Sequence, residues 1–249
     1  MSKMDEAEFH TQKNTSHGYS TFEKIKSLVD FQNGKNLSIL DVGCGQGSLD
    51  IELAQFGHTV TGLDVNLPQT SPSNPHVNFI ATDITKPWPV QNASFDLVIC
   101  TDVPEHMYNP MHVLEEAQRL LKPQGQLIFG VPNHFDLRQR LRTLFGKGIV
   151  HWDNLRHNES AWNYAHIRFF THQELIKQFV ASGWHVDTAQ FNFMGAGIVP
   201  ARLLPKFARN ILLKLYPGLF SGKFIYLLSP QQNNQKTKYI YRSTPKRGM

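Results

Sequence analysis

ILDVGCGQG, residues 39–47, is the stretch that decides the fold of this chain. An apolar strand pattern breaks into glycines just before residues 49–56, whose apolar side chains have helical spacing. Glycines let the backbone turn tightly and let a ligand approach it without a clash with Cβ. The G-x-G-x-G spacing differs from the G-x-G-x-x-G of dinucleotide-binding loops, which argues against an NAD-dependent oxidoreductase. The stretch therefore predicts a strand–turn–helix unit that holds a ligand against its backbone.

Outward from this turn, strand-like and helix-like segments alternate, which predicts an α/β fold with a parallel sheet. The expected strands are 38–42, 58–64, 77–83, 95–100, 126–131, 184–189 and 224–228. We expect an N-terminal helical segment at 1–35, one main domain at 36–230 and a flexible basic tail at 231–249. Within the main domain, residues 133–168 lose the alternation and carry many His, Arg and aromatic side chains, which predicts a lid or substrate insertion. A capping box at 171–174 opens the next helix.

The composition is that of an ordinary globular protein, with 41% hydrophobic and 18% charged residues. No apolar run approaches the roughly 20 residues that a membrane-spanning helix needs. The charged start of the chain is unlike a secretory signal peptide. Two cysteines, Cys44 and Cys100, exclude a disulfide scaffold and a four-thiolate zinc site. We therefore expect a cytoplasmic protein.

The net charge of +5 belongs to one part of the chain. After Asp187 there is no acidic residue, whereas 10 of the 25 basic residues lie there, so residues 1–187 carry 15 basic against 20 acidic residues, a net −5. The basicity is thus confined to the C-terminal quarter, and we expect no nucleic-acid partner. Segment 201–216 combines basic and apolar side chains, which leaves two interpretations open: a peripheral membrane contact, or a helix packed across the end of the sheet.

Three aspartates follow the ends of successive predicted strands beside the glycine turn. Asp41 comes directly before the turn, where a carboxylate would repel a pyrophosphate and suit an ammonium or sulfonium group. Asp64 ends the next strand, where Rossmann-like folds place an acid on ribose hydroxyls. Asp83 ends the third strand, in position for the exocyclic amine of an adenine. Each alone could be a turn or capping residue, but their recurrence beside one glycine turn predicts a ligand site.

The chain resembles the S-adenosylmethionine-dependent methyltransferases of the Rossmann-like class. The resemblance rests on stretches 41–47, 60–64, 95–100 followed by Glu105-His106, 120–125 and 131–133. It implies a mostly parallel seven-stranded sheet with helices on both faces, and S-adenosylmethionine as cofactor. Asp41 and the glycines would face the methionine part, Asp64 the ribose, and Asp83 with the Ile84 backbone the adenine. The cofactor-binding residues that it implies are Asp41, Gly43, Gly45, Asp64, Val65, Asp83, Ile84 and Thr101.

Stretches 131–133 and 166–171, with the arginines between them, are similar to a small-molecule group that includes ubiquinone- and methionine-biosynthesis methyltransferases. The resemblance implies methyl transfer to a small-molecule acceptor, at an O, N or C atom that the sequence leaves undetermined. Two other functions stay open: a cofactor-binding regulatory or partner subunit without acceptor chemistry, and an RNA methyltransferase. The sequence does not predict the oligomeric state.

For the acceptor side, the sequence offers candidate bases and metal ligands, and we assign no catalytic residue. A base is needed if the acceptor must lose a proton, and the insertion contains His134, His151, His157 and His166. The run Asp102 to His106 could hold a divalent ion through Asp102, Glu105 and His106, with His134 as a fourth ligand. The same residues could instead be loop and capping residues near the cofactor, and we assign no metal site.

Overall fold

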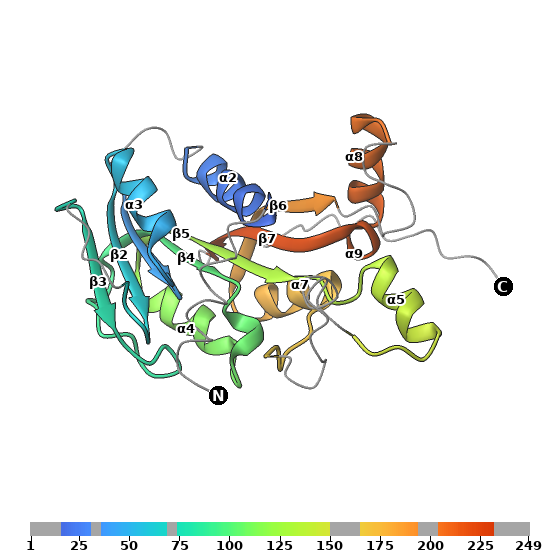
Figure 1. Ribbon diagram of the computed structural model, residues 1–249. Helices are drawn as coiled ribbons and strands as arrows, with labels where there is room; N and C mark the ends of the chain where they lie inside the picture. Colours follow the sequence, from blue (N-terminus) through green and yellow to red (C-terminus); the bar gives the residue numbers. More distant parts are fainter. Residues whose placement is uncertain (1–15, 31–35, 69–73, 150–164, 194–203, 232–249) are drawn as a thin grey trace.

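The computed structural model describes residues 16–30, 36–68, 74–149, 165–193 and 204–231 (Figure 1). Its strands are β1 Ser38–Val42, β2 Thr59–Asp64, β3 Val77–Ala81, β4 Phe95–Thr101, β5 Leu121–Pro132, β6 Trp184–Phe193 and β7 Ser221–Pro230. Its helices are α2 Ser16–Asp30, α3 Ser48–Gln55, η1 Pro104–His106, α4 Met111–Leu120, α5 Leu137–Leu144, α7 His172–Ala181, α8 Lys206–Leu215 and α9 Pro217–Phe220. The strands form one sheet in the order β3-β2-β1-β4-β5-β7-β6. Only β7 runs antiparallel to its neighbours, which confirms the predicted mostly parallel α/β sheet.

Alternate side chains of the buried strands enter two separate cores, one on each face of the sheet. Ile39 and Ile99 pack with the apolar sides of α2 and α3. Leu40 and Cys100, their neighbours along the strands, pack with α4 and α7 on the opposite face. Helices therefore cover both faces (Figure 1), as the resemblance implied.

The parallel register brings the carboxyl ends of β1 to β5 to the same edge of the sheet. In β1 and β2, Val42 lies opposite Leu63, and in β4 and β5, Thr101 lies opposite Gly130. In open α/β sheets the loops at this edge form the ligand crevice. The glycine turn after β1 lies at the centre of that edge, so the fold positions a site there.

Some element bounds differ from those expected. The fifth strand begins at Leu121 instead of residue 126, because Phe95 of β4 already pairs with Leu121 before a shift in register. The last strand extends over Ser221–Pro230, beyond the expected 224–228. In the amphipathic stretch, α8 begins at Lys206, directly after Pro205, since proline cannot donate the hydrogen bonds of a helix interior. No helix in the part of the chain that the structure describes is long and apolar enough to cross a membrane.

Candidate functional site

The glycine turn lies against the carboxyl end of β2. The Gly43 amide donates a hydrogen bond of 2.7 Å to the Leu63 carbonyl. The Gly45 amide donates to Oδ2 of Asp64 at 2.9 Å. Both glycines have positive φ, +78° and +56°, which is the left-handed region that favours glycine. The turn is therefore fixed by β2 and by the Asp64 carboxylate before any ligand binds.

Gly43 and Gly45 serve different purposes. A Cβ on Gly43 would lie 2.2 Å from Cγ2 of Val103, so this glycine lets the loop after β4 pack directly on the turn. A Cβ on Gly45 would meet no atom of the described residues within 4 Å, so the backbone there is open as far as these residues go. The turn is thus closed on the Val103 side and open at Gly45, where a ligand can lie against the backbone.

Asp64 presents a half-buried carboxylate at the end of β2. Its Oδ2 accepts the Gly45 amide, and its Oδ1 accepts the Asn66 amide at 3.0 Å. Each carboxylate oxygen has a second lone pair, so the group could still accept two hydroxyl hydrogens. This geometry fits the ribose that the resemblance implies. Val65, the next residue, is exposed at the same strand end.

Asp41 lies beneath the turn together with a second carboxyl group, that of Asp50 in the first turn of α3. Both are buried, with exposed fractions of 6% and 0%. Burial, and then repulsion from Asp50 and Asp64, raises the pKa of Asp41 well above its usual range. Burial raises the pKa of Asp50 to about 7. The pair therefore holds a proton near neutral pH, and a cationic ligand group beside it would favour its ionised form.

The adenine side of the predicted site follows β3. The amide of Thr82 donates to the Asp64 carbonyl at 2.9 Å, which keeps this end of β3 beside β2. Asp83 is exposed, and its Oδ1 accepts both the amide and the hydroxyl of Thr85, at 3.0 and 2.6 Å. These bonds lower the pKa of Asp83. Asp83 is thus held as an ionised turn residue at the same edge as Asp64.

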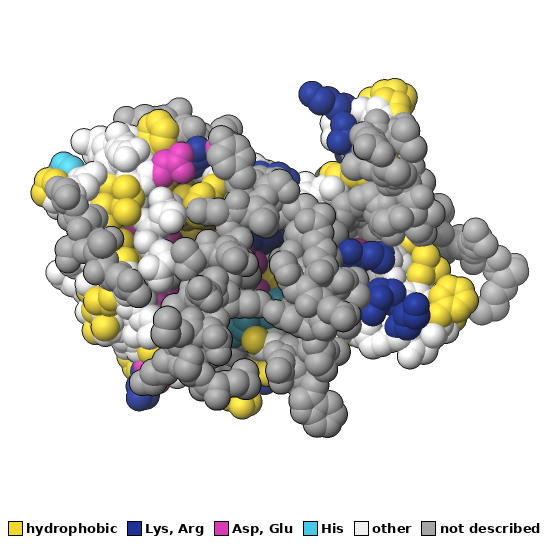
Figure 2. Space-filling view, viewed as in Figure 1, with side chains coloured by type: hydrophobic (Ala, Val, Ile, Leu, Met, Phe, Trp, Pro, Cys, Tyr) yellow, Lys and Arg dark blue, Asp and Glu magenta, His cyan; other side chains and the backbone are white. Residues whose placement is uncertain are grey.

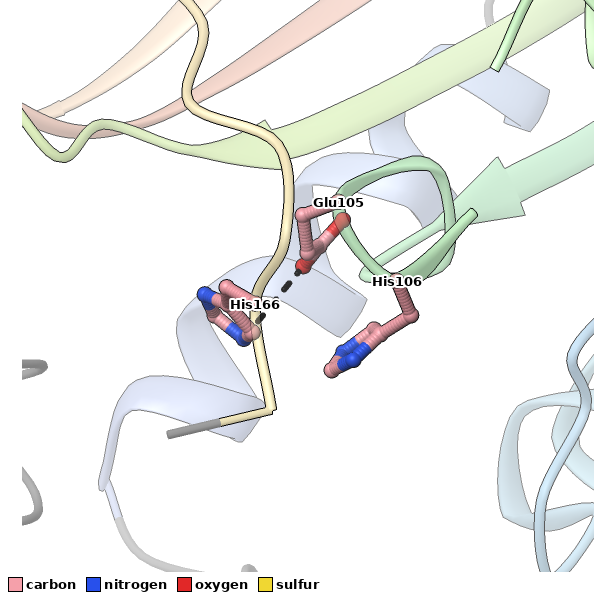
Figure 3. Close-up of side chains that lie close together, drawn as sticks. All are labelled: Glu105, His106 and His166. Atoms are coloured by element: carbon pink, nitrogen blue, oxygen red, sulfur yellow. Dashed lines mark ion pairs between the residues drawn. The ribbon is translucent and has the colours of Figure 1, made fainter. Parts of the chain in front are cut away.

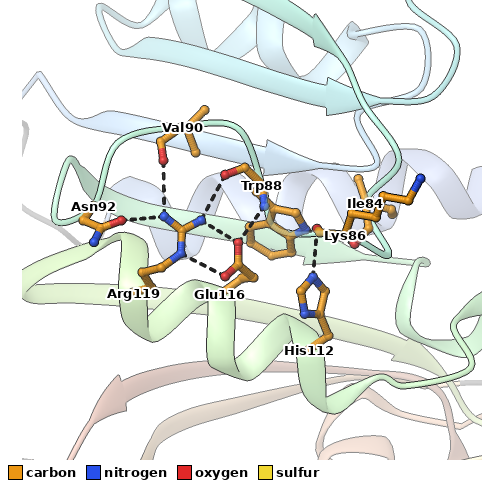
Figure 4. A network of polar contacts seen from close by, with 8 residues as sticks. All are labelled: Ile84, Lys86, Trp88, Val90, Asn92, His112, Glu116 and Arg119. Carbon is orange, nitrogen blue, oxygen red and sulfur yellow. Dashed lines mark hydrogen bonds and ion pairs between the residues drawn. The ribbon is translucent and has the colours of Figure 1, made fainter.

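A polar network anchors the connection between β3 and β4 to α4 (Figure 4). Oε2 of Glu116 accepts the Trp88 amide at 2.6 Å. The Arg119 guanidinium pairs with Glu116 at 2.5 Å and donates to the Trp88 carbonyl at 3.0 Å. The Trp88 indole in turn donates to the Ile84 carbonyl at 3.0 Å. The network fixes the backbone that follows Asp83; sequence reasoning named Ile84 but missed Trp88, Glu116 and Arg119.

The end of β4 separates Thr101, which the resemblance implied as a cofactor-binding residue, from Asp102, which the sequence offered as a metal ligand. Thr101 lies against β5, since a Cβ on Gly130 would be 2.7 Å from its Cγ2. Asp102 is exposed, has a φ of +58° and pairs with Lys223 of β7. Asp102 is not part of the group of potential metal ligands found in the described residues.

The structure instead brings Glu105 and His106 of η1 together with His166 (Figure 3). The carbonyl of Glu105 accepts the amides of Ile167 and Arg168 at 2.9 and 3.0 Å, which holds segment 165–168 on η1. Glu105 is fully buried, and Nε2 of His166 lies 4.0 Å from its Oε1. Glu105 and His106 are adjacent in the sequence, but His166 joins them only because a distant segment folds onto η1, so no local pattern indicates the whole cluster.

His134 completes this histidine cluster from the end of β5. Its Nε2 lies 2.7 Å from Nδ1 of His166, and only 2% of His134 is exposed. At this distance one of the two nitrogens donates a hydrogen and the other accepts it, since two lone pairs or two N–H groups would repel each other. His151 and His157 lie outside the described residues. Two of the four predicted base candidates thus meet beside a buried carboxylate.

The same cluster has the donor set for a divalent ion. One ligand atom each of Glu105, His106 and His166 lie within 4.8 Å of one another. Nδ1 of His106 lies 3.2 Å from the Ala165 carbonyl and donates to it, so Nε2 is the nitrogen that could bind an ion. Two imidazoles and one carboxylate can bind a transition-metal ion. From the sequence, Asp102 is a candidate metal ligand, and in the structure His166 takes its place. His134, the candidate fourth ligand, contacts His166.

A family model described as "Methyltransferase domain" matches residues 17–189. The ubiquinone biosynthesis O-methyltransferase of Hydrogenovibrio crunogenus is 30% identical over 117 residues, which are 44% of this chain and 48% of that protein. The protein of the same name from Klebsiella pneumoniae is 32% identical over 102 residues, 38% of this chain and 42% of its own length. The chain spans about half the length of the curated relatives that it matches.

Solved structures share the fold. The 1,6-didemethyltoxoflavin-N1-methyltransferase of Burkholderia thailandensis, with bound 1,6-didemethyltoxoflavin and S-adenosylhomocysteine, superposes with a TM-score of 0.55 at 17% identity, covering 90% of this chain and 84% of that one. An S-adenosylmethionine-dependent methyltransferase from Mesorhizobium loti gives a TM-score of 0.51 at 15% identity, covering 78% and 90%. At these identities the likeness concerns the fold alone, and it confirms the predicted Rossmann-like fold.

Proposed function

The chain belongs to the methyltransferase domain family, as the sequence resemblance predicted, and from this premise we propose that it methylates a hydroxyl group of a small molecule. S-adenosylmethionine is the cofactor of the predicted class, and the site fits it. Open backbone at Gly45, a carboxylate with free lone pairs at Asp64 and buried acids at Asp41 and Asp50 suit a ligand with a ribose and a cationic end.

One observation carries the proposal: the loop after β4 connects the glycine turn, on the cofactor side, to the histidine cluster, on the acceptor side. Val103 packs on Gly43, so the loop that contains Glu105 lies directly against the cofactor turn. The histidine cluster therefore adjoins the ligand-binding backbone. A methyl donor and a group that accepts a proton would be held side by side, as a displacement reaction requires.

The chain's own residues would activate the acceptor. When bound, S-adenosylmethionine supplies a methyl carbon whose bond to sulfur breaks as its bond to the acceptor oxygen forms. A hydroxyl acceptor loses its proton, and the contact between His134 and His166 provides an imidazole that can take it. The Glu105 carboxylate, 4.0 Å from His166, would stabilise the imidazolium that results. The name of the curated relatives, O-methyltransferase, supports an oxygen acceptor.

The test compares 1,2-dihydroxybenzene with 1,2-diaminobenzene as acceptors of labelled methyl from S-adenosylmethionine. We expect transfer to the diol and a loss of about 100-fold in kcat for His166→Ala. Binding of S-adenosylhomocysteine, measured by calorimetry, should stay within about twofold, because His166 lies on the acceptor side. His76→Ala is the matched control, since His76 is exposed and precedes β3 at the opposite edge of the sheet. Transfer to the diamine alone, or an unchanged kcat for His166→Ala, would contradict the proposal.

Each assay is run with EDTA and with added Mg²⁺ or Zn²⁺. A loss of activity in EDTA that the metal restores would assign Glu105, His106 and His166 to an ion instead of a proton. Activity that is indifferent to the chelator supports the histidines as the base.

A further inference from the structure

Two helices outside the site leave large apolar side chains in water. At the end of α5, Leu144 and Phe145 are each 75% exposed. On α8, Phe207 is 68% exposed, and Ile211 and Leu215 are also exposed. No residue of α8 is fully buried. Exposed apolar side chains that gather in one region mark an interaction surface.

The apolar residues of α8 form one stripe. Phe207, Ile211 and Leu215 follow one another at intervals of four, so they lie on the same side of the helix. Leu212 and Leu213 are half-buried, and α8 contacts α9 and β6. In Figure 1, α8 projects from the body of the molecule. The stripe is therefore not needed to hold the helix in place.

The two helices lie at the same end of the molecule (Figure 1), and α9 contacts both of them. The Asn133 side chain donates to the Gly218 carbonyl of α9 at 3.1 Å, which ties α9 to the end of β5. We call the exposed apolar residues of α5 and α8, with the basic residues beside them, the α5–α8 surface. Its apolar members are Leu144, Phe145, Phe207, Ile211 and Leu215.

The charged residues of the α5–α8 surface are all basic. Residues 137–149 and 204–231 contain no Asp or Glu. Exposed Lys214 lies beside the stripe on α8, exposed Lys206 directly precedes Phe207 at the start of the helix, and exposed Lys147 follows Phe145. Figure 2 shows Lys and Arg side chains beside hydrophobic ones at the right-hand end, where α5 and α8 lie in Figure 1. A partner must therefore offer negative charge together with an apolar interior.

We propose that the α5–α8 surface docks on an anionic phospholipid bilayer. The apolar stripe would enter the boundary between headgroups and acyl chains, and the lysines would contact the phosphates. An anionic bilayer offers both negative charge at its surface and hydrocarbon beneath it, which are the two features that this surface requires. The inference does not depend on methyl transfer, because none of the residues that carry it belongs to the site.

The test measures flotation of the full chain with vesicles of phosphatidylcholine alone and of phosphatidylcholine with phosphatidylglycerol. We expect binding to the anionic vesicles only, and weaker binding as salt is added. The triple variant Phe207→Ser, Ile211→Ser, Leu215→Ser should lower the partition coefficient by about tenfold or more. Phe56→Ser is its control, since Phe56 is 63% exposed and follows α3, far along the sheet from α8.

A second variant tests the charges without touching the stripe. The pair Lys206→Glu and Lys214→Glu should also lower partition by about tenfold or more, since each basic residue near the surface is worth on the order of 1 kcal/mol. Lys177→Glu, at an exposed position of α7, should have no effect. These substitutions change only exposed side chains, so they remain informative if the triple variant does not fold.

Three results would overturn the proposal. They are no binding of the wild type to anionic vesicles, undiminished binding of both the triple and the lysine variants, or losses of binding in the controls Phe56→Ser and Lys177→Glu as large as those in the variants. Light scattering adds a further check. A wild-type dimer that the triple variant converts to a monomer, with no vesicle binding, would assign the stripe to a second copy of the chain.

Discussion

Replacing Asp50 by asparagine should make the protein more stable, and the gain should grow as the pH rises. Asp50 is fully buried, and burial raises its pKa from 3.8 to about 7. Between these two pH values the folded chain holds a proton that the unfolded chain has lost. Stability is therefore greatest in acid and falls as the pH rises toward 7, where the full cost of a buried carboxylate is reached. Asparagine has a similar shape and does not titrate.

The magnitude follows from the two pKa values. At roughly 1.4 kcal/mol for each pH unit, the raised pKa of Asp50 lowers the free energy of unfolding by about 1–2 kcal/mol near pH 5, where the folded chain holds the proton, and by about 4 kcal/mol near pH 8, where the buried carboxylate is ionised. The free energy of unfolding of Asp50→Asn minus that of the wild type should thus rise by about 2–3 kcal/mol between these pH values. Any constant cost of burying the amide cancels in this difference.

Urea unfolding at about pH 5 and about pH 8 measures the effect. Glu115→Gln is the matched control, because Glu115 is exposed on α4 and the same carboxyl-to-amide change should be neutral at both pH values. A gain for Asp50→Asn that does not depend on pH would refute the reasoning. It would mean that Asp50 is ionised throughout, or that its proton is shared with Asp41 in a way that the substitution preserves.

Three further predictions concern the cofactor side. Asp64→Ala should weaken binding of S-adenosylhomocysteine by roughly 1–3 kcal/mol in calorimetry, because a carboxylate acceptor and a bond to the Gly45 amide are both lost; unchanged affinity would place the ribose elsewhere. Gly43→Ala should lower the melting temperature and the affinity together, because its Cβ would overlap Val103; a native melting curve would show that the loop after β4 yields. Arg119→Ala should cost about 1–3 kcal/mol in urea unfolding by leaving partners of its guanidinium unpaired; a change below about 0.5 kcal/mol would contradict the anchoring role.

The sequence could predict the cofactor side because its signals are local. A strand, a glycine turn and a helix follow one another within residues 39–56, and parallel strands necessarily place Asp41, Asp64 and Asp83 at one edge. Asp50 was missed although a signal exists. It precedes Leu53 by three residues and Ala54 by four, so helical periodicity places it on the buried side of α3.

The acceptor side could not be predicted in the same way. His134 and His166 meet only because segment 165–168 hydrogen-bonds to the Glu105 carbonyl, a contact between residues about sixty positions apart. No periodicity encodes such a meeting. Asp102, by contrast, lies close to Glu105 in sequence yet pairs with Lys223, because its positive φ and the neighbouring strand decide its direction. The roles of the predicted cofactor-binding residues stay predictions.

The position of β7 has a consequence for biosynthesis. This strand is the last that the structure describes, yet it lies inside the sheet, between β5 and β6. While the ribosome has not yet released residues 221–230, both neighbours present unpaired edges, and such edges attract other chains. The aromatic side chains of Phe224 and Tyr226, fully buried in the finished protein, arrive at the same late moment. The growing chain should therefore depend on chaperones until β7 is inserted, and premature termination before residue 221 should yield an aggregating product.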